Sequence, residues 1–352
     1  MTARDPLWQY YILGSTGMRV SPLALGTMTF GNREWGANEE VSRTIFHHYI
    51  NCGGNFVDTA NAYADGTSEA LLGKFIEETG NRDELVLATK FTAPRRQRDP
   101  NAGGNGRKNI IASLDESLRR LRTDYIDLYW LHIWDTLTPA EEVMSTLDTL
   151  VRAGRVRAIG LSDVPAWYAA KSHTIAQIRG WEPLAALQLQ YSLVERNIER
   201  EHVPAAVDLG VSIVPWSPLA NGFLAGKYAR GSDGVTGEGR VQTFGSKPDW
   251  NGHSDTDWHV LDTLLDVASA LERSPAQVAL NWITGRPGVA STLVGARTVD
   301  QLLDNIAALE FSIPDEHVER LEEAGRPEIH HPYDMHLPEV RRFLHGGTIV
   351  SR

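Results

Sequence analysis

The sequence predicts a single (β/α)8 TIM barrel. Short apolar runs rich in strand-forming residues alternate with amphipathic helical stretches along the 352 residues. Eight such runs can be counted. They lack the apolar–polar alternation of a strand with one face in water, so we expect a parallel sheet covered on both sides. Eight parallel strands can close on themselves, which leaves no exposed sheet edge.

The expected strands, in chain order, are 23–27, 56–58, 85–90, 126–132, 156–162, 186–190, 212–216 and 292–294. Apolar stripes at helical spacing predict the helices between them. For example, Thr138-Pro139-Ala140-Glu141 predicts a capping box, and Gly154 should end the helix that it opens.

Both ends of the chain depart from the alternation. The segment Tyr10–Ser21 has a Gly14-Ser15-Thr16-Gly17 centre, which predicts a β-hairpin that caps the bottom of the barrel from outside. From about Gly325 onward we expect an irregular tail on the same single domain. The glycine-rich stretch Ala229–His253 predicts a long loop that is either functional or disordered.

Composition narrows the possible partners. Lys+Arg 34 against Asp+Glu 45 gives a net charge of −11, which argues against a general nucleic-acid or membrane-surface partner. The sequence contains no apolar run long enough to span a bilayer, and its beginning lacks the apolar core of a signal peptide. With Cys52 as the single cysteine, no intrachain disulfide can form. We therefore expect a cytoplasmic protein, and the oligomeric state is left open.

Groups suited to proton transfer end three of the expected strands. Asp58, Lys90 and His132 lie at the ends of 56–58, 85–90 and 126–132, and Tyr63 follows Asp58 by five residues. Each alone has an ordinary explanation as a helix cap, a solvated amine or a core imidazole. In barrels, however, the C-terminal ends of the strands form the catalytic face. The four residues together therefore predict a proton-transfer site.

The four side chains have complementary chemistry. A tyrosine has a pKa of about 10, and a nearby ammonium lowers that value because it favours the phenolate. Lys90 could do this if Asp58 holds it in place, and His132 could orient a carbonyl oxygen. Such a set would protonate an oxygen as it becomes an alkoxide.

At these positions the chain resembles the aldo-keto reductases, from the hairpin at Leu13 to about Leu309. The motif Asn55…Asp58-Thr59-Ala60…Tyr63 is similar to the family's first signature. The resemblance implies that Asp58, Tyr63, Lys90 and His132 form the catalytic tetrad, with Tyr63 as proton donor. Residues 99–105 and 131–135 resemble the aryl-alcohol dehydrogenase branch of the family.

The phosphate end of a nicotinamide cofactor would have to bind without a Rossmann unit, since no G-x-G-x-x-G follows the first strand. After the strand 292–294, Thr298-Val299-Asp300-Gln301 predicts a capping box, and the helix N-terminus it opens attracts anions. Arg297 could grip a phosphate there or be merely solvated. The resemblance implies that Gly295, Arg297, Gln301 and Asn305 contact the adenosine phosphate and adenine. Arg297 then favours NADPH/NADP+ over NADH.

The resemblance also assigns the nicotinamide end. Ser162, Asp163 and Gln188 would hold the carboxamide, and Trp216 would stack on the ring. The family usually has asparagine in place of Asp163, and a carboxylate can accept from the amide but cannot donate to it. The expected pyrophosphate strap comprises Ser217, Leu219, Leu224 and Lys227. The loop Ala229–His253 would be a lid over it.

Phe30, Trp35 and Trp134 follow the first and fourth strands and are expected to bind substrate. An aromatic mouth favours flat, apolar carbonyl compounds, although ordinary loop packing also explains these residues. The expected activity is therefore NADPH-dependent reduction of small carbonyl compounds, above all aromatic aldehydes. One alternative is a nicotinamide-sensing regulatory subunit, because the resemblance extends to potassium-channel β subunits. Another alternative is a metal-dependent barrel hydrolase. Such an enzyme needs paired His or carboxylate ligands at strand ends. The pair His47-His48 lies in a helical stretch, so its two side chains cannot converge on one ion.

Overall fold

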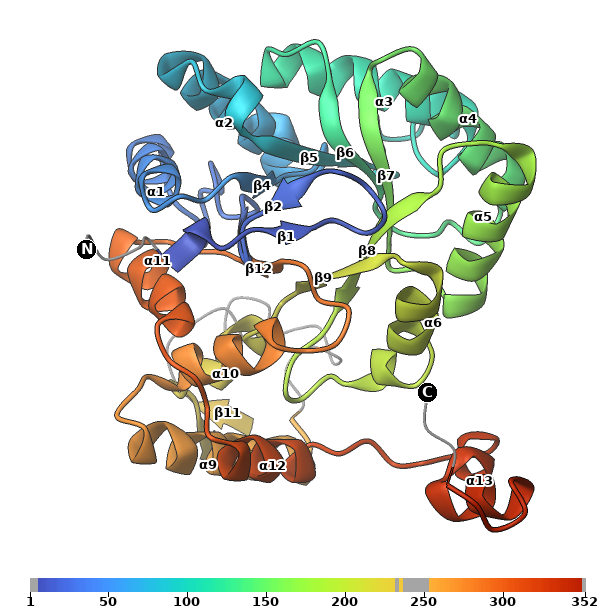
Figure 1. The fold of residues 1–352 in the computed structure, drawn as a ribbon. Helices are drawn as coiled ribbons and strands as arrows, with labels where there is room; N and C mark the ends of the chain where they lie inside the picture. Colours follow the sequence, from blue (N-terminus) through green and yellow to red (C-terminus); the bar gives the residue numbers. More distant parts are fainter. Residues whose placement is uncertain (1–5, 232–233, 237–252, 350–352) are drawn as a thin grey trace.

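The computed structural model describes residues 6–231, 234–236 and 253–349, and an eight-stranded parallel sheet forms its centre (Figure 1). The strand order is β12-β3-β4-β5-β6-β7-β8-β9. The bounds are β3 Leu23–Gly26, β4 Phe56–Asp58, β5 Val86–Phe91, β6 Ile126–Leu131, β7 Val156–Ser162, β8 Leu184–Gln190, β9 Ser212–Trp216 and β12 Thr292–Val294. A parallel bridge between Ile213 of β9 and Val289, just before β12, brings the two edges together. The predicted (β/α)8 barrel is confirmed.

Helices surround the sheet (Figure 1). The α-helices of the barrel are α1 Glu39–Asn51, α2 Thr67–Thr79, α3 Arg107–Leu121, α4 Ala140–Arg152, α5 Ala166–Arg179, α6 His202–Leu209, α9 Asp255–Ala270, α10 Pro275–Thr284, α11 Val299–Ile306 and α12 Asp315–Ala324. Short 3-10 segments are η1 Pro6–Trp8, η2 Tyr63–Gly66, η3 Arg82–Glu84, η4 Asn197–Glu199, η5 Ala220–Ala225 and η6 Ala307–Leu309. Within the described parts of the chain, none of the helices combines the length and apolarity that a bilayer crossing requires.

Alternate strand residues fill the inside of the barrel. Phe56, Ala88, Leu128 and Trp130 belong to a fully buried cluster that also contains the small side chains of β7 and β8. Their neighbours along each strand belong to the larger cluster that packs against the helices. Because side chains alternate between faces, positions two residues beyond Phe56, Ala88 and Trp130 also point inward, at the C-terminal rim.

The N-terminal hairpin consists of β1 Tyr11–Ile12 and β2 Arg19–Val20, paired antiparallel. The backbone N–H of Gly14 donates to the Oγ of Ser212 at 2.7 Å, and a Cβ on Gly14 would lie 2.2 Å from the Ala185 carbonyl oxygen. Ser212 and Ala185 stand at the starts of β9 and β8. The hairpin therefore caps the bottom of the barrel, opposite the rim where catalytic groups are expected.

The capping box predicted for α4 is wrong. The N-cap is Pro139, which has no side-chain acceptor. Thr138 instead donates its backbone N–H and hydroxyl to the carboxylate of Asp135, at 2.8 and 2.6 Å. The Asp135 carboxylate is charged and therefore a stronger hydrogen-bond acceptor, so Thr138 bonds to it instead of capping the helix. The end of α4 agrees with the prediction, since Gly154 follows with φ of 70°.

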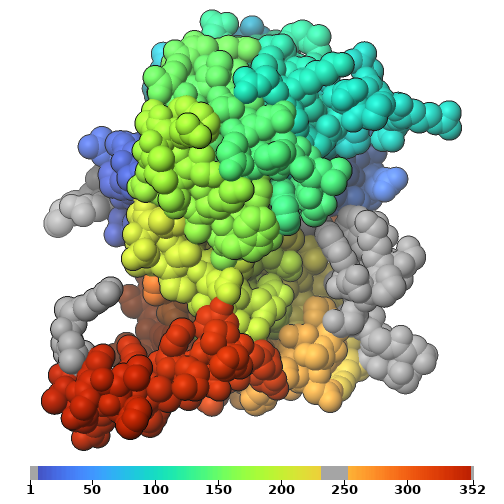
Figure 2. All heavy atoms as spheres, turned by 90° about the vertical axis from the view of Figure 1, so that its right-hand side faces the viewer, coloured from blue at the N-terminus to red at the C-terminus, as the bar shows by residue number. Residues whose placement is uncertain are grey.

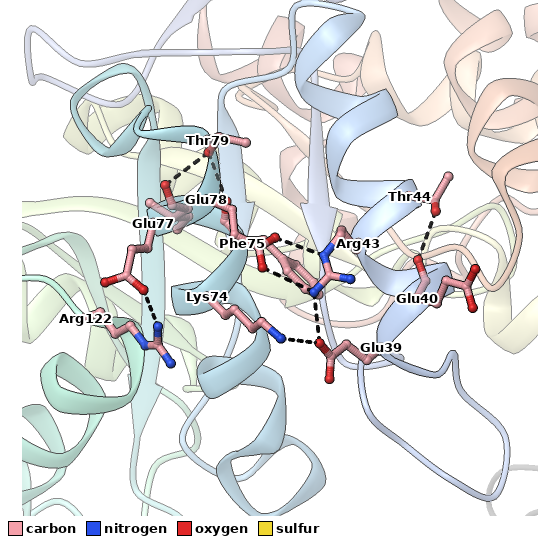
Figure 3. Close-up of polar contacts among 11 residues, drawn as sticks. Glu39, Glu40, Arg43, Thr44, Lys74, Phe75, Glu77, Glu78, Thr79 and Arg122 are labelled. Atoms are coloured by element: carbon pink, nitrogen blue, oxygen red, sulfur yellow. Dashed lines mark hydrogen bonds and ion pairs between the residues drawn. The ribbon is translucent and has the colours of Figure 1, made fainter.

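Helix α2 is tied to the helices on both sides (Figure 3). Arg43 of α1 donates from Nε to Glu78 at 2.9 Å, and Lys74 pairs with Glu39 of α1 at 2.7 Å. At the end of α3, Arg122 pairs with Glu77. Exposed pairs of this kind contribute little stability one by one, but together they restrict how α2 can shift.

Beyond Gly325 the chain runs along the outside of the barrel (Figures 1 and 2). The tail expected to be irregular contains η7 Tyr333–His336 and helix α13 Pro338–Leu344. In the region of the predicted lid, β10 Ala229–Gly231 and β11 Gly234–Thr236 form an antiparallel pair. Most of the remaining residues of the lid lie outside the described parts of the chain.

Candidate active site

The four residues predicted to be catalytic meet at the C-terminal rim. The ammonium Nζ of Lys90 donates to the carboxylate of Asp58, to the Thr59 carbonyl oxygen at 2.7 Å and to the Tyr63 hydroxyl at 3.3 Å. The Tyr63 ring meets the His132 ring edge to face, with centroids 5.9 Å apart. A phenol, an ammonium, a carboxylate and an imidazole therefore share one site.

The register of the sheet explains why they meet. Asp58 of β4 pairs with Ala88 of β5, and Lys90, two residues further on, pairs with Trp130 of β6. Trp130 is fully buried beneath the site, and it needs Gly160 of β7, where a Cβ would lie 2.1 Å from Cε3 of the indole. The large indole thus forms a floor beneath the charged groups.

The ammonium of Lys90 stays charged although the side chain is fully buried. Burial works against the charge, but the attraction of the Asp58 carboxylate and the contacts with Tyr63 outweigh it, so the pKa of Lys90 lies above its ordinary value. A buried cation is tolerated when it is paired and hydrogen-bonded, as this one is. The site therefore contains a fixed positive charge beside the phenol.

The expected lowering of the tyrosine pKa is not what the structure gives. Burial raises the pKa of Tyr63 above its ordinary value, and the Lys90 ammonium opposes this shift only in part. The sequence could show that an ammonium was near, but not how strongly burial would disfavour the phenolate. Tyr63 consequently holds its proton at neutral pH, as a general acid must before the reaction.

His132 is neutral in this setting. Burial, with a further contribution from Lys90, lowers its pKa to about 3. A neutral imidazole has one N–H donor and one acceptor nitrogen. His132 can therefore donate a hydrogen bond to a carbonyl oxygen without bringing a proton that competes with that of Tyr63.

The residues expected to hold the nicotinamide lie on the adjoining strand ends. Ser162 of β7 pairs with Gln188 of β8, and Trp216 ends β9. Gln188 donates from Nε2 to the Asp58 carboxylate at 3.1 Å, which the sequence did not indicate. Trp216 donates its indole N–H to Asp163 at 3.0 Å. Their contact with a cofactor remains a prediction.

Asp163 is a half-buried carboxylate at the end of β7. Burial raises its pKa to about 6, against the opposing effects of the Trp216 hydrogen bond and the Lys90 charge. Its backbone is left-handed, with φ of 47°. A carboxylate with a raised pKa therefore lies at the end of the site where the nicotinamide is expected.

The expected pyrophosphate strap follows Trp216. Ser217 is left-handed, and its Oγ accepts from the backbone N–H of Asn221 at 3.2 Å. Leu219 is half-buried and Lys227 is exposed. Leu224 is fully buried in the hydrophobic core, so its side chain supports η5 rather than offering a surface to a cofactor.

The expected phosphate end lies where β12 leads into α11. Thr298 caps this helix and accepts from the Gln301 backbone N–H at 3.2 Å, but the Gln301 side chain accepts from Arg297 N–H at 2.9 Å instead of completing a capping box. Buried Asn305 reaches the Gly295 carbonyl oxygen at 3.5 Å. Arg297 is exposed and forms no ion pair with another described residue. This helix end fits a phosphate by charge and by donors.

The three residues expected to bind substrate differ in their burial. Phe30 does not lie at the surface of the mouth, because it is fully buried and packs edge-on against Phe75 of α2. Trp35 is half-buried. Trp134 packs against Trp167 and Tyr168 of α5, with ring centroids 5.3 and 5.1 Å away. The two α5 aromatics were missed, although Trp167-Tyr168 in the first turn of the helix that follows Pro165 could have indicated them.

Comparison with known proteins agrees with this geometry. The aldo/keto reductase family model matches residues 22–326. The oxidoreductase YrpG of Bacillus subtilis (strain 168) is 37% identical, covering 88% of this chain and 93% of its own. Norsolorinic acid reductase stcV of Emericella nidulans is 34% identical, covering 92% and 81%. The NADP(+) aryl-alcohol dehydrogenase of Phanerodontia chrysosporium is 33% identical, covering 87% and 82%.

The matched region contains every strand of the barrel and the four side chains that meet at its rim. It begins just before β3 and ends just after α12, so the N-terminal hairpin and most of the tail lie outside it. The chain therefore belongs to the aldo/keto reductase family of oxidoreductases.

Proposed function

We propose that this protein reduces aldehydes and ketones to alcohols with NADPH, and that aromatic aldehydes are its preferred substrates. The observation that carries the proposal is the 3.3 Å contact between the Tyr63 hydroxyl and the Lys90 ammonium, with Asp58 behind the ammonium. A protonated phenol held against a buried cation suits proton donation to an oxygen that gains negative charge.

The bound NADPH would supply the hydride that reduces the carbonyl carbon. His132 donates its N–H to the carbonyl oxygen and orients it. As that oxygen becomes an alkoxide, Tyr63 gives up its proton, and the Lys90 ammonium stabilises the phenolate that remains. Asp58 and the Thr59 carbonyl hold the ammonium in place throughout. Solvent then returns a proton to Tyr63.

The cofactor assignment rests on the rim residues and on Arg297. The guanidinium beside the N-terminus of α11 suits the extra phosphate of NADPH, because both donors and charge favour a dianion there. One relative is named for NADP(+). Ser162, Gln188 and Trp216 would hold the nicotinamide. We also propose that the chain is one catalytic domain and that it works in the reducing cytoplasm.

The substrate class rests on the aromatic side chains of the mouth. The rings of Trp134 and Trp167 meet edge to face, and Trp167 remains 55% exposed, whereas Tyr168 is buried and supports Trp134 from the core. Aromatic faces of this kind favour flat apolar ligands. The relative named aryl-alcohol dehydrogenase agrees with this assignment.

Transfer of a label tests the proposal. Purified protein is mixed with benzaldehyde and NADPH deuterated at either face of C4, and the benzyl alcohol is analysed by mass spectrometry. One of the two labelled cofactors should deliver deuterium to the carbinol carbon in repeated turnovers. Turnover no faster than cofactor exchange would contradict the proposal and favour the nicotinamide-sensing subunit. A parallel assay with NADH measures the expected preference for NADPH.

A further inference from the structure

The turn that carries Tyr63 has an unusual backbone. Ala64 (φ 47°, ψ 45°) and Asp65 (φ 52°, ψ 38°) are both left-handed, and Gly66 follows with φ of 86°. This conformation is unfavourable for an ordinary L-residue, so two of them in succession persist only where the surroundings hold the turn. The position of the phenol therefore depends on what packs against these residues.

The guanidinium of Arg120, on α3, packs directly against Gly66. A Cβ on Gly66 would lie 2.6 Å from Cζ of Arg120 and 2.7 Å from its Nε, so a side chain here would displace the guanidinium. Arg120 donates from Nη1 to Glu69 of α2 at 3.0 Å and from Nη2 to Glu116 at 3.3 Å. The guanidinium is thus fixed on one side by carboxylates and meets the turn on the other.

Glu69 links this contact to the strand that carries Lys90. The side chain of Glu69 is fully buried, and its second oxygen accepts from the Thr89 hydroxyl at 2.7 Å. Thr89 directly precedes Lys90 on β5. One buried carboxylate therefore bridges the guanidinium against the Tyr63 turn and the strand residue next to the ammonium.

A hydroxyl cluster holds the start of α2 in the same place. Ser68, next to Glu69, donates to the Thr27 carbonyl oxygen at 2.8 Å and lies 3.1 Å from the Thr59 hydroxyl. Thr27 and Thr59 immediately follow β3 and β4. The first turn of α2 is thus fastened to the strand ends, while Arg120 fixes the turn that precedes it.

We propose that Arg120 and Glu69 are positioning residues that set the distance between the Tyr63 hydroxyl and the Lys90 ammonium. The inference rests on the proposed function, in which Tyr63 gives the proton. Among the described residues, Arg120 and Glu69 form hydrogen bonds and ion pairs with Glu116, Thr89 and each other, and none with the four rim groups, so each acts through the turn or through Thr89. A shift of about 1 Å in a catalytic group can lower turnover by about 10²-fold.

The variant Arg120→Met tests the inference, with Arg119→Met as the matched control, because Arg119 is the adjacent, exposed arginine of α3. We expect Arg120→Met to lower kcat for benzaldehyde by about tenfold to 10²-fold. KM and the Kd of NADPH should change by less than about twofold, because the variant leaves the interactions that bind substrate and cofactor in the ground state unchanged. The deuterium isotope effect on kcat should rise as chemistry becomes slower. Arg119→Met should match the wild type in all of these.

Unchanged kcat in a folded Arg120→Met protein would overturn the inference, and so would a parallel loss of NADPH binding, which indicates general structural damage. If Arg120→Met does not fold, the isosteric Glu69→Gln and Gly66→Ala probe the same bridge from its two ends, and both should lower kcat selectively. The double variant Arg120→Met/Glu69→Gln should lose no more than the worse single variant, because both act through one bridge. Additive losses would contradict it. Failure of the wild-type protein to reduce aldehydes would instead refute the proposed function.

Discussion

Asp163 shows how one side chain can adjust the chemistry of this site. It places a carboxylate where the resemblance predicts an asparagine, and burial raises its pKa to about 6. Two ionisable groups interact with it: the Lys90 ammonium, which lowers the pKa of Asp163, and the Tyr63 phenol, whose own pKa Asp163 raises. The ionisation of Asp163 therefore changes the pKa of Tyr63, the residue proposed to donate the proton.

The charge of Asp163 should affect which cofactor form binds. Above pH about 6 the ionised carboxylate attracts the cationic oxidised ring, by about 2 kcal/mol even at ~8 Å with an effective dielectric constant of ~20. Below that pH the acid is neutral. We expect the ratio of Kd for NADP+ to Kd for NADPH to rise about tenfold as the pH falls from about 8 to about 5. Tryptophan fluorescence titrations measure it, and the shared phosphate groups cancel in the ratio.

Asp163→Asn should make this ratio independent of pH while keeping an acceptor for the Trp216 indole. The matched control is Asp115→Asn, since Asp115 pairs with Arg155 at the opposite end of β7. It should behave like the wild type. A ratio with the same pH dependence in Asp163→Asn and in the wild type would show that Asp163 does not sense the ring.

The convergence of Asp58, Lys90 and His132 could be predicted from the sequence because these residues end strands, and parallel strand ends meet at one rim. Properties that depend on burial could not be predicted in this way. The pKa of Tyr63 is raised rather than lowered, and Phe30 is enclosed by the core rather than lining the mouth. Residue type and spacing do not reveal how completely neighbouring elements will cover a side chain.

At the scale of elements, strands were easier to predict than helix caps. Four strands, including β4 and β7, have the predicted bounds, because a buried strand is defined by its own continuous apolar run. The α4 cap failed because Asp135, outside the four-residue pattern, competes for Thr138. Cap patterns describe local sequence, whereas the hydrogen bonds go to whichever acceptor is best placed.

Strand β7 should tolerate no side chain at Gly160. A Cβ there would lie 2.1 Å from the buried Trp130 ring, and the indole cannot move away inside a filled barrel. We expect Gly160→Ala to lower the free energy of unfolding by about 2 kcal/mol, as overpacking typically does. Urea denaturation measures this. Gly285→Ala is the control, because its Cβ would meet nothing closer than 3.7 Å. Equal stability of the two variants would contradict the packing described here.

At the scale of the whole molecule, the N-terminal hairpin and the predicted catalytic residues lie at opposite ends of the barrel. The hairpin closes the bottom through Gly14, whereas the four rim residues lie at the other end of the strands. This division is typical of the fold, in which the C-terminal face carries function. Changes at the hairpin should therefore alter stability without altering the chemistry.

Gly14→Ala tests this division. Its φ of 57° and the Ala185 carbonyl oxygen, 2.2 Å from a Cβ, both oppose a side chain. We expect a loss of about 2 kcal/mol in the free energy of unfolding, with kcat per folded molecule unchanged. Gly17→Ala in the same hairpin is the control, since no atom lies within 4 Å of its Cβ. A fall in the kcat of folded Gly14→Ala protein would show that the two ends are coupled.

The central claim is that the Tyr63 phenol, held beside the Lys90 ammonium, gives the proton. The most direct measurement is kcat for benzaldehyde in Tyr63→Phe, together with the Kd of NADPH. Tyr125→Phe is the control. Tyr125 lies just before β6, far along the strand from the rim, and its hydroxyl donates to Asp83. We predict that Tyr63→Phe loses about 10³-fold in kcat, as expected for removal of a general acid, while NADPH still binds. Turnover retained at the wild-type rate would contradict the account.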